Sequence, residues 1–92
     1  MKIEIQSLFL KKLNRQVAYI ASDKPQAARR FKQKLLNQIR TLESHPLKHR
    51  KSIYFEDDTI RGMIFMGYVI VYKIELDKII VFGLMKYEQG FK

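Results

Sequence analysis

The fold of this chain is decided by three apolar stretches: IRGMIFM (60–66), YVIVYKI (68–74) and IIVFGLM (79–85). Each stretch is apolar at both odd and even positions. Because successive side chains of a strand point to opposite faces of a sheet, this pattern predicts strands whose sheet is apolar on both faces. Tight turns at Gly67 and at Leu76-Asp77 separate the stretches. We therefore expect an antiparallel meander of three strands, at about residues 59–66, 68–75 and 78–85.

Upstream of the meander, two segments have the spacing of amphipathic helices. The first covers about residues 8–21, with Ser7 as a plausible N-cap, and the second covers about residues 25–44. Pro25 suits the first turn of the second helix, where a missing N–H costs nothing. The apolar positions are Leu10, Leu13, Val17 and Ile20 in the first helix, and Ala28, Phe31, Leu35, Ile39 and Leu42 in the second.

Two further segments complete the predicted order of elements. Residues 2–5 (KIEI) alternate and predict a short edge strand, and residues 52–58 (SIYFEDD) can add another that ends in an acidic turn. The short connection between the helices predicts an antiparallel helical hairpin. We expect one α+β domain over residues 1–92, with the hairpin packed on one face of a small antiparallel sheet. Two helices cover about one face, so the second apolar face is left for a partner.

Charge is distributed unevenly along the chain, whose formal net charge is +9. Residues 1–51 carry 13 Lys and Arg against 3 Asp and Glu, whereas residues 52–92 carry 5 against 6. A basic helical half beside a neutral, apolar strand half favours an anionic partner, either nucleic acid or an acidic protein segment. The alternative is that the basic face only keeps the protein in solution.

Composition excludes several classes of protein. The chain has no cysteine, which removes disulfides and thiolate metal sites and makes a reducing compartment, the cytoplasm, the default expectation. Residues 1–5 (MKIEI) contain Glu4 and lack the apolar core of a signal peptide. No stretch approaches the ~20 uninterrupted apolar residues that span a bilayer, so we expect a soluble protein without a membrane partner.

The sequence holds few candidates for catalysis. It has no zinc-binding spacing, no glycine-rich phosphate loop, and no HExxH or EF-hand pattern, so no metal or cofactor is expected. The consecutive acids at 56–58 fit a solvated turn better than a pair for acid–base catalysis. Metal-independent RNA cleavage would need basic and phenolic groups that converge on one phosphate. The candidates for that role are Arg61, Lys73, Lys86 and Tyr87, with His49, Arg50 and Lys51.

Four stretches carry a resemblance to a known family. They are YIASDKPQAARRF (19–31), LESHPLK (42–48), IRGMIFMGYVIVYKI (60–74) and KIIVFGLM (78–85). Together, in this order and spacing, they resemble the RelE/ParE superfamily of toxins from bacterial type II toxin–antitoxin systems. The resemblance covers nearly the whole chain and implies two antiparallel helices on one face of a small twisted antiparallel sheet. It also implies a cognate antitoxin, whose flexible segment folds around the toxin and covers apolar and basic surface.

The superfamily divides by function, and one position bears on the division. RelE-like members are ribosome-dependent mRNA endonucleases that typically carry an Arg just after the Gly-Tyr of the third strand. In this chain Val69 follows Gly67-Tyr68. Loss of a comparable oxyanion donor costs about 3–4 kcal/mol of transition-state stabilisation, so Val69 disfavours nuclease chemistry. The PQAARRF helix start, Arg61 and GYVIVY resemble instead the ParE-like branch, whose members bind DNA gyrase and have no known nuclease activity.

The resemblance therefore predicts a ParE-like toxin rather than an enzyme. It is expected to inhibit growth by binding DNA gyrase and to be neutralised by an antitoxin, in a complex that can be of higher order. The residues expected to bind a partner are Val69, Val71, Lys73, Arg61, Lys86 and Tyr87. The alternative is a RelE-like endoribonuclease acting on ribosome-bound mRNA through Lys86, Tyr87 and the basic connector at 48–51. A third alternative is a nucleic-acid-binding module that uses the basic second helix.

Overall fold

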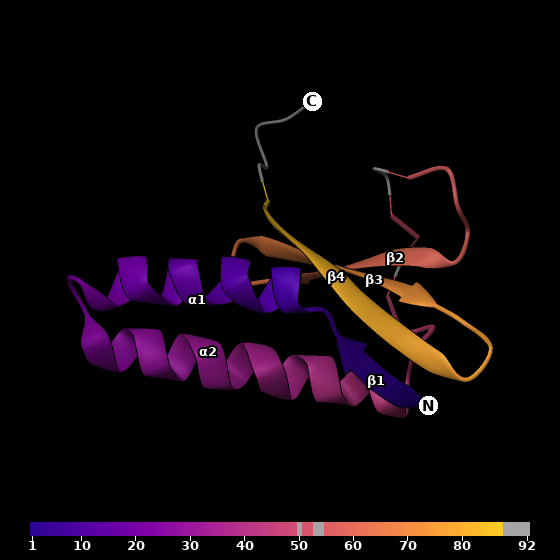
Figure 1. Ribbon diagram of the computed structural model, residues 1–92, viewed down its shortest axis with the longest axis horizontal. Coiled ribbons are helices and arrows are strands. Elements are labelled where there is room, and N and C mark those ends of the chain that lie inside the picture. The colour runs from indigo at the N-terminus through magenta and orange to yellow at the C-terminus, as the bar shows by residue number, and fades with distance from the viewer. Residues whose placement is uncertain (50, 53–54, 88–92) are drawn as a thin grey trace.

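Two antiparallel helices lie against one face of a four-stranded sheet, as Figure 1 shows. The computed structural model describes residues 1–49, 51–52 and 55–87. Within them the elements are β1 (Lys2–Ile5), α1 (Ser7–Ala21), α2 (Pro25–Arg40), a 3-10 turn η1 (Thr41–Glu43), β2 (Ile60–Phe65), β3 (Tyr68–Ile74) and β4 (Lys78–Lys86). The predicted α+β fold and its order of elements are confirmed.

The sheet has the strand order β1-β4-β3-β2 and is mixed. Strands β2, β3 and β4 form the predicted antiparallel meander. Strand β1 pairs with β4 in the parallel direction, with Ile3 opposite Ile79. The sheet is therefore not antiparallel throughout, because the chain crosses the helical layer after β1 and a crossover brings strands together in parallel.

The helix ends follow the sequence signals only in part. Pro25 is the first residue of α2, as predicted. The N-cap of α1 is Gln6, without a side-chain cap, so the prediction that Ser7 caps this helix is wrong. The regular part of α2 ends at Arg40, earlier than predicted, and η1 continues the chain to Glu43. This tighter turn leads directly to Pro46, whose preceding residue avoids the α region.

The main core lies between the helices and the sheet. Every position of the predicted α2 stripe is buried, and Leu35 is fully so. In α1 the buried residues are Phe9 and Leu13, whereas Leu10, Val17 and Ile20 are only partly buried at the edge of the core. The sheet contributes to this core Met63 of β2, Ile70 and Tyr72 of β3, and Ile79, Val81 and Leu84 of β4.

A second apolar cluster lies on the sheet face away from the helices, because its β3 residues alternate with those that face the helices. We call it the outer cluster, and it consists of Ile60, Val69, Val71, Phe82, Met85 and Tyr87. Val69 is 5% exposed and Val71 is 1% exposed. The expectation that these two valines stay uncovered is therefore wrong, since side chains of the chain itself pack over this face. Phe55 contributes to the cover through an edge-on contact with Phe82, with ring centroids 5.9 Å apart.

The segment before β2 is described only in part, because residues 50, 53 and 54 lie outside the described residues. Lys51 forms an isolated bridge with Arg61, and the Ser52 N–H donates to the Ile60 carbonyl over 2.9 Å. Of the additional strand predicted at 52–58, the described residues 52 and 55–58 are not in a strand, and the bridge lies just before them, at Lys51. Throughout the described part of the chain, no helix has the length and apolar character needed to cross a membrane.

Candidate functional site

Arg61 lies at the start of β2, on the face toward the helices, opposite Tyr72 of β3. Its Nη1 donates a hydrogen bond to the His49 carbonyl over 2.7 Å. The Tyr72 hydroxyl donates in the same region to the Pro46 carbonyl over 2.9 Å. Both side chains therefore fasten the connector after η1 to the sheet, and we call this arrangement of Arg61, Tyr72 and residues 46–49 the connector clamp.

Burial within the connector clamp shifts the pKa values of Tyr72 and His49 in the directions that favour their neutral forms. Burial raises the pKa of Tyr72 to about 12, against an opposing effect of the nearby Arg61 charge. Burial, and secondarily the positive charge of Lys48, lowers the pKa of His49. The His49 ring packs edge-on against Tyr72, with centroids 6.4 Å apart. Arg61 Nε and His49 Nε2 are buried without a hydrogen-bond partner. The hydrogen bonds and ring contact of the clamp join the connector to the sheet, as expected for residues with a structural role.

Two further cations near this end of the sheet, Lys51 and Lys73, lie beside the acidic turn. Lys51 Nζ lies 3.5 Å from Asp58 and Lys73 Nζ lies 3.8 Å from Asp57. Asp57 also accepts hydrogen bonds from the N–H and hydroxyl of Thr59, at 2.9 and 2.6 Å, and the hydroxyl is the main reason that its pKa is lowered. The acids at 57 and 58 therefore form the predicted solvated turn. Arg50 lies outside the described residues.

Lys86 and Tyr87 lie at the opposite end of the sheet. Lys86 is opposite Tyr68, which in turn is opposite Phe65, four residues after Arg61. At about 3.3 Å per residue, this separates the two groups by about 13 Å along β2. The Tyr87 N–H donates to the Gly67 carbonyl over 2.8 Å, and its ring packs on the outer cluster. The structure therefore brings Arg61, His49 and Lys51 together but does not bring Lys86 and Tyr87 to them.

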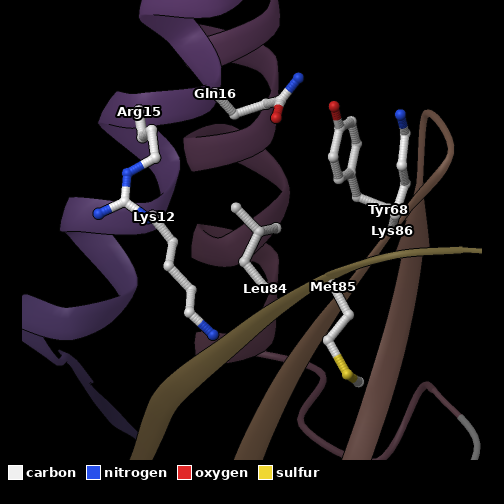
Figure 2. A pocket seen from close by; sticks show the side chains of 7 residues that line it. All are labelled: Lys12, Arg15, Gln16, Tyr68, Leu84, Met85 and Lys86. Atoms are coloured by element: carbon white, nitrogen blue, oxygen red, sulfur yellow. The ribbon is translucent and has the colours of Figure 1, made fainter.

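A shallow hollow of about 240 Å³ lies beside Lys86, between α1 and the ends of β3 and β4 (Figure 2). We call it the basic hollow, and it is lined by Lys12, Arg15, Gln16, Tyr68, Leu84, Met85 and Lys86. Apart from Lys86, the sequence analysis did not single out these residues as a site. The sequence feature that could have indicated this site is the composition of α1, which contains basic residues and no acidic ones.

Three of the exposed apolar side chains are candidates for partner contact near the outer cluster. Ile64 is 52% exposed and lies on the same sheet face as Ile60, since both occupy even positions of β2. Met66 in the β2–β3 turn is 60% exposed, and Phe55 is 42% exposed. We call Phe55, Ile64 and Met66 the apolar rim, because a partner on this side would meet these side chains before the buried valines.

Comparisons with known proteins agree with this architecture. No curated protein matches the chain. Among solved structures, a chain from "Chromosomal ParDE TA system from P. aeruginosa" superposes with a TM-score of 0.81 at 12% sequence identity. The match covers 96% of this chain and 97% of that chain, and at this identity it shows a shared fold.

A family model gives the assignment. The model described as "ParE toxin of type II toxin-antitoxin system, parDE" matches residues 3–89. That range includes both helices, all of the meander and nearly all of β1. Membership of a parDE system implies an antitoxin partner. The chain therefore belongs to the family of ParE toxins of type II toxin–antitoxin systems.

Proposed function

We propose that this ParE-family toxin arrests growth in the cytoplasm by binding DNA gyrase, and that its cognate antitoxin neutralises it by covering its surface. The main support for the proposal is the position and the burial of Val69. This residue occupies the position where RelE-like nucleases typically carry an Arg, and its side chain is buried in the outer cluster. An apolar, buried side chain supplies no charge to a phosphate in a transition state.

The arrangement of the basic candidates also supports action by protein contact. Arg61 and His49 are engaged in the connector clamp, while Lys86 lies at the other end of the sheet. Lys51 and Lys73 lie beside carboxylates of the acidic turn. General acid–base catalysis needs groups within hydrogen-bond reach of the same substrate atom or linked to it by one water. Lys86 and Tyr87 lie too far from Arg61 and His49 to share one substrate atom with them.

The surface suits a partner that is both apolar and acidic. The apolar rim offers exposed hydrophobic side chains, and the helical layer carries basic side chains with few acids between them. Apolar contacts supply most of the affinity at such an interface, and complementary charge raises the rate of association. An antitoxin segment with both characters would cover the surface that gyrase uses.

A supercoiling assay with purified gyrase tests the proposal. The toxin is expected to inhibit supercoiling and to leave gyrase-linked, cleaved DNA, and prior addition of the antitoxin should restore activity. The control is the toxin variant Leu35→Asp, whose buried charge should unfold the domain and abolish inhibition. Unchanged supercoiling at a large toxin excess would reject gyrase as the target. Cleavage of messages in the ribosomal A site, detected by primer extension, would instead establish nuclease activity.

A further inference from the structure

Strand β2 is the last strand on one side of the sheet, so one of its edges faces away from β3. The Ile74 N–H donates to the Thr59 carbonyl over 2.9 Å, and the register of β2 with β3 continues from there without a shift. In an antiparallel pair, successive residues turn their N–H and carbonyl groups to opposite sides of the strand. Residues 61, 63 and 65 therefore bond to β3, whereas residues 60, 62 and 64 turn these groups outward, away from the sheet.

The segment before β2 covers only the first part of this outer edge. The Ile60 N–H donates to the Asp57 carbonyl over 3.0 Å, and the Ile60 carbonyl accepts from the Ser52 N–H over 2.9 Å. Among the described residues, none forms a hydrogen bond with the outward N–H or carbonyl of Ile64. The outer edge of β2 is therefore open around Ile64, up to the turn at residues 66–67.

The side chains at this open edge are apolar. Residues 62–67 (GMIFMG) include no charged residue and no proline, and Ile64 and Met66 are 52% and 60% exposed. Proteins commonly protect an edge strand with charges, prolines or bulges, because an open edge can pair with another chain. The other edge of this sheet, at β1, carries Glu4, which pairs with Lys78 over 3.3 Å. The open edge of β2 lacks such charges and is suited to pair with another strand.

A second copy of the chain fits this edge through twofold symmetry. If two β2 strands pair antiparallel with Ile64 opposite Ile64, the N–H of each donates to the carbonyl of the other, and both open edges gain partners at once. The same register places Gly62 opposite Met66 of the second copy. Because Gly62 has no side chain, the exposed Met66 side chain has room to lie across it, beside the two Ile64 side chains. We propose that the free toxin forms a dimer through the β2 edge, about a twofold axis at Ile64.

The size and charge of this contact predict a weak, reversible dimer. The contact consists of two backbone hydrogen bonds and the Ile64 and Met66 side chains of each copy, which is small beside the ~1,200 Å² or more buried in stable complexes. Each chain carries a formal net charge of +9, so the two copies repel each other. Salt screens this repulsion, and the dimer should therefore strengthen as the salt concentration rises. Binding of an acidic strand to the same edge would weaken with salt.

Sedimentation equilibrium of the purified toxin without antitoxin tests the proposal. The weight-average mass should rise with protein concentration from the mass of the monomer toward twice that mass, and it should rise further in higher salt. Over the same concentrations the Ile64 amide should become protected from hydrogen exchange, because its N–H gains an acceptor. A toxin that stays monomeric at millimolar concentration, or a dimer whose Ile64 amide is unprotected, would overturn the proposal.

A charged substitution at the proposed axis separates the β2 edge from other surfaces. Ile64→Lys should fold, because the side chain is half exposed, and its dimer should be at least about tenfold weaker, since like charges directly opposite each other repel. Leu76→Lys is the matched control, because it adds the same charge at a fully exposed residue of the β3–β4 turn. Its dimer affinity should stay within about twofold of the parent. Equal dimer affinities of the two variants, both shown to be folded by circular dichroism, would reject the β2 edge.

A single cysteine tests the register, since the chain has no cysteine of its own. In the proposed dimer the two residues at position 64 form a hydrogen-bonded pair, whose Cα atoms lie about 5.5 Å apart. A short bifunctional maleimide should therefore link two copies of Ile64→Cys rapidly, and should link Leu76→Cys slowly at the same protein concentration. Equal rates of cross-linking, measured on denaturing gels, would contradict the register.

Addition of the cognate antitoxin distinguishes the two occupants that the edge could accept. Protection of the Ile64 amide in the toxin alone, together with the mass of a dimer, supports pairing between copies. Protection that appears only in the antitoxin complex, with a monomeric free toxin, would overturn the proposal and assign the edge to an antitoxin strand. The dimer requires no action on gyrase, so the two proposals can fail separately.

Discussion

At the scale of single residues, the most informative side chains are those of the connector clamp. Arg61 is charged and appeared in the sequence as a candidate for catalysis or partner binding, yet its Nη1 is bonded to the His49 carbonyl. Tyr72 is fully buried, but its hydroxyl reaches the Pro46 carbonyl. A backbone carbonyl in a connector without regular structure needs such a donor when water is excluded. The clamp therefore fixes the path of the chain from the helices into the sheet.

Removal of the Tyr72 hydroxyl should destabilise the fold. In Tyr72→Phe the ring still fills the core, but the Pro46 carbonyl loses its donor, so the free energy of unfolding should fall by about 1–1.5 kcal/mol. Urea denaturation followed by circular dichroism measures this change. The control is Tyr19→Phe, since Tyr19 is 74% exposed and its hydroxyl bonds to no described residue. A Tyr72→Phe variant as stable as the control would show that the hydrogen bond contributes nothing.

The neutral state of His49 predicts a dependence of stability on pH. Its pKa is lower in the folded chain than the usual 6.5, so the unfolded chain binds a proton first as the pH falls. This contribution to stability is complete above about pH 6.5 and is lost below it, as the pH approaches the folded pKa. The unfolding free energy should therefore decrease as the pH falls below about 6.5, and His49→Gln should lack that decrease. The same slope in both proteins would assign it to other groups.

At the scale of elements, local patterns and long-range pairing differ in how far they could be predicted. The three strands and both helices follow from periodicity, which depends only on neighbouring residues, and the stripe of α2 was correct at every position. The parallel pairing of β1 with β4 and the register shift between Val71 and Tyr72 were not predicted. Both depend on contacts between segments far apart in sequence, which no local pattern encodes.

The basic hollow could not be predicted either, because it also depends on contacts between segments far apart in sequence. Lys12 and Arg15 belong to the wet side of α1 in any helical projection, and Lys86 ends a strand more than 70 residues later in the chain. Only the packed structure brings them around one hollow. The burial of Val69 and Val71 was not predicted for the same reason. It depends on aromatic side chains from distant parts of the chain, Phe55 before β2 and Phe82 and Tyr87 in and after β4.

The packing of α2 on the sheet gives a prediction at this scale. Leu35 is fully buried between the helices and the sheet, so Leu35→Ala should cost about 2–5 kcal/mol of stability through lost burial and the cavity left behind. Chemical denaturation of the purified variant measures this loss. Leu47→Ala is the matched control, since Leu47 is 66% exposed and the change should stay within about 0.5 kcal/mol. Equal stability of both variants would contradict the described core.

At the scale of the whole molecule, the ion pairs and the cations of the helical layer lie on different parts of the fold. The ion pairs of the described chain join residues of the strands and the acidic turn, while the cations of the helical layer have no carboxylate within reach. The exposed apolar rim lies toward the opposite face of the sheet. A protein with this layout presents two chemically different surfaces, and an antitoxin that wraps around it can engage both.

The apolar rim is expected to contribute to antitoxin binding. Ile64→Ser should leave the fold intact, because the side chain is half exposed, and should weaken the toxin–antitoxin complex by about 1–3 kcal/mol as buried apolar area is lost. Isothermal titration calorimetry with the cognate antitoxin measures the difference. Leu76→Ser is the control, since Leu76 is fully exposed in the β3–β4 turn, at the end of the sheet away from Met66. If the two substitutions weaken binding equally, the rim is not the contact surface.

The central claim is that this toxin acts on gyrase by protein contact and not by cutting RNA. The most direct measurement is made on cells collected a few minutes after induction of the toxin, in which gyrase covalently bound to chromosomal DNA and the ends of messenger RNA are determined on the same sample. A toxin that acts by contact with gyrase should raise the number of gyrase-linked DNA breaks and leave the transcripts intact. Unchanged gyrase–DNA complexes together with new transcript ends at ribosomal A sites would contradict this claim.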